Sequence, residues 1–83
     1  MWGDGMNIEE FLTVLRAGAK DFSRSNLPGA DLSYLNLTDT DLCRDNLSEA
    51  NLSEANLSGA DLSGADLFGV NLTDVKIKKK DSE

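Results

Sequence analysis

The chain of 83 residues contains no histidine, one cysteine and one proline. Without histidine, general acid–base chemistry near neutral pH lacks its commonest side chain. The single cysteine, Cys43, excludes a disulfide within the chain. No apolar stretch reaches the roughly 18 residues of a membrane-spanning helix. We therefore expect no enzyme, no catalytic residue, no cofactor and no metal ion.

Basic residues are scarce beside acidic ones, 8 against 15, and the net charge is −7. This balance argues against direct contact with nucleic-acid phosphates and against attraction to an anionic membrane surface. The first residues lack a basic region followed by an apolar run, so they do not resemble a secretory signal. Together with the lone cysteine, this predicts a cytoplasmic protein.

A large apolar side chain returns every five residues through most of the chain. Asp or Asn comes directly before it in every repeat except at Lys76, and the residue two places before it is usually small. The twelve apolar positions, which we expect to form the core, are Phe22, Leu27, Leu32, Leu37, Leu42, Leu47, Leu52, Leu57, Leu62, Leu67, Leu72 and Ile77.

A period of five suits neither a helix nor a flat strand, because helices repeat every 3.6 residues and strands every two. A chain that bends at every fifth residue solves the problem. Four short walls then close a square coil of 20 residues, and successive coils stack at about 4.8 Å. We define coil one as residues 20–39, coil two as 40–59 and coil three as 60–79. Residues 20 apart, such as Phe22, Leu42 and Leu62, are then expected to stack.

The pentads Ala50-Asn51-Leu52-Ser53-Glu54 and Ala60-Asp61-Leu62-Ser63-Gly64 resemble the A(D/N)LXX unit of the pentapeptide-repeat family. The resemblance covers residues 20–79. It implies an all-β fold, a right-handed quadrilateral β-helix, here of three coils.

Residues 7–17 are predicted to form a helix. Ile8, Phe11, Leu12 and Leu15 make one apolar stripe, and Asn7 with Glu10 has the pattern of a capping box. Met6 occupies the position of a hydrophobic staple, and Gly18 suits the left-handed residue that ends a helix. So short a helix needs a partner for its stripe. We expect it to be the lid of coil one rather than a membrane-binding helix.

The predicted organisation is a flexible leader (1–5), a capping helix (6–19), the repeat column (20–79) and a flexible tail (80–83). Coil three has no obvious lid and would leave an apolar edge with unpaired backbone groups. Either its lysines protect this edge, or two chains pair through it as a homodimer, which is the alternative that we favour.

Several polar side chains are candidate sites. Asp21, Asp41 and Asp61 stack on one wall, where they either bind a cation or, as we favour, bond nearby backbone amides. Their mutual repulsion predicts that at least one titrates above an ordinary Asp. Asp45 stands where a small inward residue is expected, so either Ser25 donates to it or it swings outward. Cys43 faces outward and is expected to be an inert surface thiol.

A packed column has no deep pocket, so its outward residues are the natural binding surface. We expect a non-enzymatic scaffold for an unknown protein partner, with Tyr34 and Phe68 as candidate contacts. The alternative, from the resemblance, is an acidic mimic of duplex DNA that occupies a type II topoisomerase such as gyrase. The negative charge fits this alternative, whereas the shortness of three coils does not.

Overall fold

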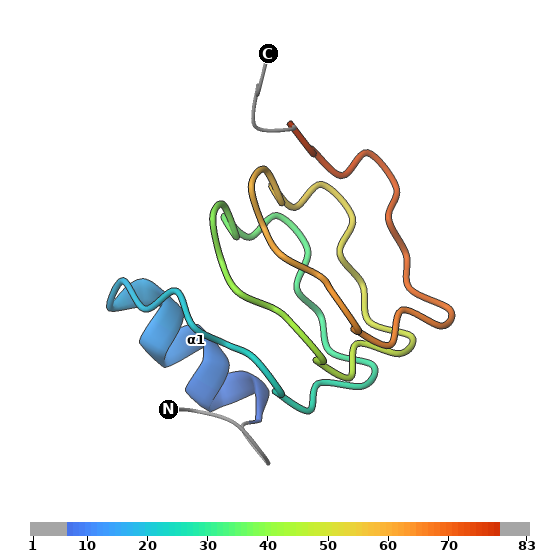
Figure 1. The fold of residues 1–83 in the computed structure, drawn as a ribbon. Coiled ribbons are helices and arrows are strands. Elements are labelled where there is room, and N and C mark those ends of the chain that lie inside the picture. Colours follow the sequence, from blue (N-terminus) through green and yellow to red (C-terminus); the bar gives the residue numbers. More distant parts are fainter. Residues whose placement is uncertain (1–6, 79–83) are drawn as a thin grey trace.

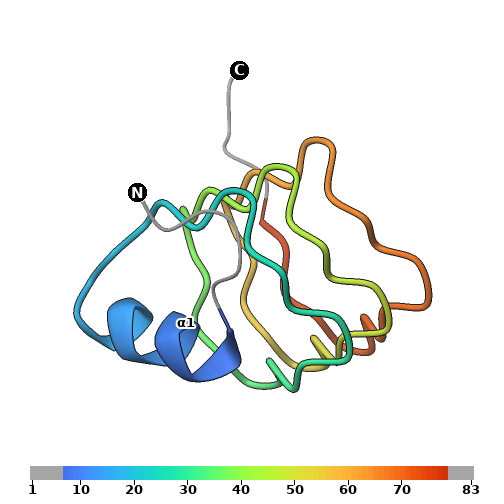
Figure 2. The same cartoon turned by 90° about the horizontal axis from the view of Figure 1, so that it is seen from below.

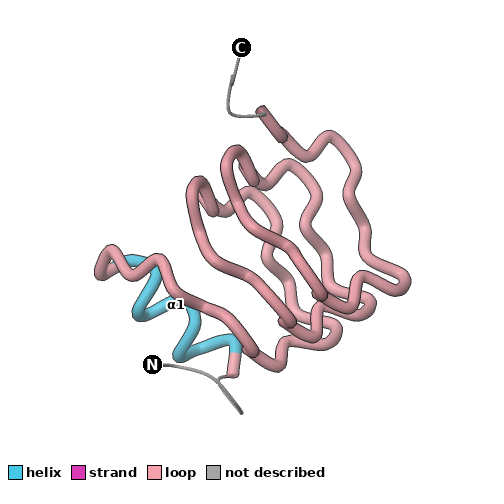
Figure 3. Tube along the Cα trace, viewed as in Figure 1, coloured by secondary structure: helices cyan, strands magenta, loops and turns pink. Residues whose placement is uncertain are grey.

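The computed structural model describes residues 7–78. In this range one helix, α1 (Ile8–Arg16), is followed by a backbone that winds in stacked turns (Figure 1). The winding part contains no extended strand within the described residues, and Figure 3 colours all of it as loop and turn. The predicted leader, the staple residue Met6 and the predicted tail lie outside the described residues.

Eight parallel bridges join the turns, and each pairs residues 20 apart, from Asp21 with Asp41 to Asn56 with Lys76. The predicted stacking of every twentieth residue is therefore confirmed. Each apolar position of coils one and two donates its backbone N–H to the next coil, as Leu27 N does to Asn46 O at 2.8 Å. The chain pairs only briefly before it bends again, so isolated bridges replace long strands. Figure 2 shows the successive turns side by side from a second direction.

Each bend places its last residue in the left-handed region of backbone conformation. Glycine occupies that position at Gly29 and Gly64, with φ of 70° and 72°, but Arg24, Tyr34 and Glu54 adopt the same conformation at 64–66°. An ordinary side chain is disfavoured there. The hydrogen bonds between coils hold these residues in place, since Arg24 N donates to Cys43 O at 2.9 Å.

Helix α1 begins with the predicted capping box. The Asn7 side chain accepts from Glu10 N at 2.9 Å, and Asn7 N donates to the Glu10 carboxylate at 3.2 Å. Gly18 follows the helix with φ 99°, as its position predicted. With 9 residues α1 is too short to cross a bilayer, and residues 7–78 hold no other helix that would.

The apolar stripe of α1 packs against coil one. Phe11 is fully buried, and its ring centroid lies 4.4 Å from that of Phe22. Ile8, Leu12 and Leu15 are partly buried against the same cluster. Helix α1 therefore packs against the part of the column that contains Phe22.

The inward side chains of coils one and two form the core. The eight apolar positions from Phe22 to Leu57 are each at most 2% exposed. The last four differ: Leu62 is only partly buried, and Leu67, Leu72 and Ile77 are 36%, 43% and 59% exposed. The prediction that Leu67, Leu72 and Ile77 belong to the core is therefore wrong. A coil is covered by the coil that follows it, and within residues 7–78 nothing follows coil three.

Candidate functional site

We call the four pentads of each 20-residue turn its walls, so that the first wall holds residues 20–24, 40–44 and 60–64. The second wall holds 25–29, 45–49 and 65–69, and the third holds 30–34, 50–54 and 70–74. The fourth holds 35–39, 55–59 and 75–78. The bridges between coils place the members of each wall above one another.

The first wall carries the predicted column of Asp21, Asp41 and Asp61. Asp21 accepts from the backbone N–H and the hydroxyl of Ser23, at 3.1 and 2.8 Å. Asp61 accepts in the same way from Ser63, at 3.0 and 2.6 Å. These side chains therefore bond the bend that follows them, which is the interpretation we favoured over cation binding.

These hydrogen bonds show that neither Asp21 nor Asp61 is the member of the column that we expected to titrate above an ordinary Asp. Bonds from the Ser23 backbone and hydroxyl lower the pKa of Asp21, and bonds from the Ser63 hydroxyl and backbone lower the pKa of Asp61. Asp31, on the third wall, has its pKa lowered by Ser33 in the same manner. Donors two residues away outweigh the opposite effect of burial, because they stabilise the charged form directly. A serine two residues after the aspartate was the signal for this effect.

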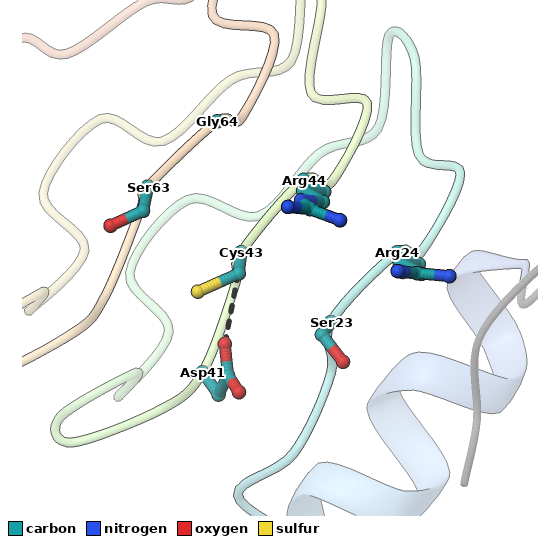
Figure 4. A pocket seen from close by; sticks show the side chains of 7 residues that line it. All are labelled: Ser23, Arg24, Asp41, Cys43, Arg44, Ser63 and Gly64. Atoms are coloured by element: carbon teal, nitrogen blue, oxygen red, sulfur yellow. Dashed lines mark hydrogen bonds between the residues drawn. The ribbon is translucent and has the colours of Figure 1, made fainter.

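Cys43 lies near two carboxylates of this wall, and Figure 4 draws one of them, that of Asp41. The sulfur of Cys43 and one carboxylate oxygen each of Asp41 and Asp61 all lie within 4.8 Å of one another. Hydrogen bonding of the thiol to Asp41, and then to Asp61, raises the pKa of Cys43 to about 12. A thiol that stays protonated is a poor nucleophile and a poor metal ligand. This geometry therefore favours the inert interpretation of Cys43.

A shallow pocket of about 430 Å³ lies on the same wall (Figure 4). Arg24, Arg44 and Gly64 contribute the residues at its bends, and a Cβ at Gly64 would lie only 3.2 Å from the Cγ of Arg44. The pocket is open to solvent and combines two guanidinium groups with the Asp41 carboxylate. Its mixed charge selects neither an anion nor a cation.

Asp45 on the second wall points inward and is 1% exposed. Its Oδ1 accepts from Ser25 N at 2.9 Å, so Ser25 donates through its backbone. Its Oδ2 is buried and has no hydrogen-bond partner among residues 7–78. Burial raises the pKa of Asp45 to about 7, and the nearby carboxylates of Asp41 and Asp21 act in the same direction. The sequence marked Asp45 as irregular but did not show which way it would turn.

The two aromatic contact candidates are exposed, Tyr34 by 76% and Phe68 by 74%. They do not form one patch by position, since Tyr34 belongs to coil one on the third wall and Phe68 to coil three on the second. Three other large apolar side chains are exposed among the described residues, Leu67, Leu72 and Ile77, and they lie on the open face of coil three.

Comparison with known families gives a match to a family model described as pentapeptide repeats. It covers 8 copies over residues 20–44 and 46–79, and the position between the two stretches is Asp45. No curated protein matches the chain.

Among solved structures, the chain is similar to alr5209, a pentapeptide repeat protein from Nostoc Pcc 7120. The two are 30% identical, with a TM-score of 0.72, and the similarity covers 95% of this chain and 81% of that one. Similarity at this level implies the right-handed β-helix that the resemblance led us to expect.

Proposed function

The chain belongs to the pentapeptide-repeat family, and from that premise we propose that it is a non-enzymatic scaffold for protein–protein contact. One observation carries the proposal: the interior is filled. Leu37, Leu47 and Leu52 are 0% exposed, so ligands meet only the walls and the open end. The backbone of the walls is held by hydrogen bonds between coils, as between Leu52 N and Asn71 O at 2.8 Å. A rigid surface loses little conformational entropy when it binds a partner.

The chemistry of the described polar groups also supports a scaffold. Cys43 has a thiol whose pKa is raised to about 12, and Asp45 is buried away from any substrate. We propose a reducing compartment such as the cytoplasm, supported by the free thiol of Cys43. The DNA-mimic alternative gains no support from the comparisons, and we do not propose it.

We propose the finer architecture as well: a quadrilateral column of three coils over residues 20–79, with α1 as its lid. The eight bridges at a separation of 20 residues support the coils. The contact between the Phe11 and Phe22 rings supports the lid.

Tyr34 and Phe68 are the aromatic contacts that we propose for a protein partner. The test is affinity capture by the whole chain, with each partner that is identified then purified and its affinity measured against Tyr34→Ala and Phe68→Ala. Glu49→Ala is the matched control for Tyr34, because both residues end a bend at positive φ. Pro28→Ala is the control for Phe68, since both occupy the same wall and the same place in the pentad.

We expect at least one aromatic variant to weaken binding by about tenfold or more, as truncation of a buried aromatic contact does. Both controls should bind as the natural chain does. Equal binding by all four variants would remove Tyr34 and Phe68 from the proposal. Failure of the purified chain to bind any captured protein would overturn the scaffold itself.

A further inference from the structure

The open face of coil three carries a row of unused backbone groups. In coil two the equivalent groups are bonded, as in Leu47 N to Asp66 O at 2.9 Å and Asn71 N to Ala50 O at 3.0 Å. Within residues 7–78 the N–H groups of Leu62, Leu67, Leu72 and Ile77, and the carbonyls of Ala60, Ala65, Val70 and Val75, have no such partner. The N–H groups of Gly64, Gly69 and Asp74, whose equivalents in coil two also donate to coil three, likewise have no such partner within this range, so each of the first three walls offers one acceptor and two donors.

The same face exposes apolar side chains inside this ring of donors and acceptors. Leu67, Leu72 and Ile77 are 36%, 43% and 59% exposed. An apolar surface bordered by unpaired edge groups is a template for another β edge. We propose that it docks the same face of a second copy of this chain, related by a two-fold axis; this names a partner for the scaffold function proposed above and rests on it.

The pattern of donors and acceptors complements itself under such an axis. Two faces related by a two-fold run antiparallel, and antiparallel pairs exchange N–H and C=O bonds on either side of a central residue. In coil three each central residue, such as Asp66, has a free carbonyl before it at Ala65 and a free N–H after it at Leu67 within the described range. Each wall therefore matches any other wall once it is reversed.

The two open faces can be aligned in several ways, and the charges of the central residues favour one of these alignments. The central residues of the four walls are Asp61, Asp66, Asn71 and Lys76. Placing Asp61 opposite Lys76 of the second copy pairs all four walls and creates two opposite-charge pairs, with Asp66 opposite Asn71. Alignments centred on Asp66 or on Lys76 place like charges opposite each other, which destabilises antiparallel pairs.

An alignment centred on Asn71 places Asp66 opposite Lys76, but in a four-walled coil it also places Asp61 opposite Asp61 of the second copy, which is a like-charge pair. The Asp61–Lys76 alignment has no like-charge pair among the central residues.

The same alignment fits side-chain sizes. It sets Leu62 opposite Val75, Leu67 opposite Val70, Leu72 opposite Ala65 and Ile77 opposite Ala60 of the second copy. Every large residue faces a smaller one, so the two layers can interdigitate as the coils of one chain do.

The size of the face agrees with a specific dimer of moderate affinity. The two shorter dimensions of the molecule are 26 and 23 Å. A face of that size pressed against its copy buries on the order of 1,000 Å² in total, which is near the lower limit of specific interfaces.

Sedimentation equilibrium of the whole chain tests the proposal. We expect a species of twice the 9.0 kDa chain mass. Lys76→Glu should weaken dimerisation by about tenfold or more, because it faces Asp61 twice. Adding Asp61→Lys to Lys76→Glu should restore the dimer. Lys78→Glu is the control, since it makes the same charge change on the same wall but faces no central residue.

Other outcomes overturn the proposal. A monomer at all concentrations up to about 100 µM would exclude a specific dimer of this size. A dimer indifferent to Lys76→Glu would mean that another surface mediates it. Rescue by Asp66→Lys, and not by Asp61→Lys, would refute the alignment in favour of the one centred on Asn71. A monomer that still binds a captured protein would leave the scaffold function standing, so the two proposals fail separately.

Discussion

The two ends of the column are built from the same pentad but end differently. Coil one meets α1, and Phe22 at that end is 0% exposed. Coil three meets nothing within the described residues, and Ile77 is 59% exposed. On the third wall, Leu32, Leu52 and Leu72 have the same place in the repeat, with exposures of 1%, 0% and 43%. Burial is therefore decided by the neighbouring coil and not by the residue's place in the pentad.

A carboxylate placed in the same column at coil two or coil three makes the sharpest test of this difference. Leu52→Asp puts a charge where coils lie on both sides, and we expect it to unfold the protein, with a loss of more than about 4 kcal/mol. Leu72→Asp leaves its carboxylate at the open face, where water can solvate it. Far-UV circular dichroism and thermal melts compare the two. Equal loss of structure in both variants would contradict the difference between the coils.

Truncation of one phenylalanine at each end compares how much the α1 end and the open end contribute to the free energy of unfolding. Phe11→Ala removes the ring packed on Phe22 and should cost about 3 kcal/mol of unfolding free energy. Phe68→Ala, which starts from a side chain 74% exposed, should change stability by less than about 0.5 kcal/mol. Urea unfolding of the two variants measures both values. A small effect at Phe11 would show that α1 is not needed to close coil one.

The raised pKa of Asp45 makes the free energy of unfolding depend on pH. Its folded pKa, about 7, lies above its ordinary value of 3.8. The stability contributed by the protonated form is fully present below pH 3.8 and is lost as the pH rises through 7. The lowered pKa values of Asp21, Asp31 and Asp61 change the free energy of unfolding only below about pH 3.8, the ordinary pKa value. Unfolding free energy should thus fall between about pH 4 and 7, by on the order of 2–4 kcal/mol.

Two variants check the source of this pH dependence. Asp45→Asn should flatten the profile between pH 4 and 7, and an unchanged slope would assign it to other groups. The double variant Asp45→Ala, Ala65→Asp moves the carboxylate one coil toward the open face. NMR titration should find the pKa of the carboxylate introduced by Ala65→Asp nearer to the ordinary value than that of Asp45 in the natural chain.

The smallest expected loss of stability concerns the first turn of α1. Asn7→Ala removes the acceptor for Glu10 N and should cost about 1 kcal/mol. Thr13→Ala, which removes a hydroxyl bond to Glu9 O within α1, is a control at an exposed helical position. Chemical denaturation resolves a difference of this size. Equal stability of Asn7→Ala and the natural chain would mean that packing alone holds α1 in place.

Much of the column was predictable because the five-residue spacing of apolar residues is visible in the sequence itself. An apolar residue every fifth position, as at Leu42 and Leu47, leaves few ways to gather the apolar side chains, and the bridges follow. Helix α1 was predictable because the Asn7 and Glu10 cap is a local signal. The pKa directions of Asp21 and Asp61 were not foreseen, because we weighed stacked charges 20 residues apart above serines two residues away.

The sequence by itself determined the repeat, the helix and the separation of 20 residues between stacked positions, since each depends on spacing along the chain. Only the tertiary structure decided which apolar residues are buried, that Asp45 turns inward and that Cys43 lies between two carboxylates. Those outcomes depend on what lies in the next coil. Exposure and pKa are set by surroundings in space, and a chain read one pentad at a time does not contain them.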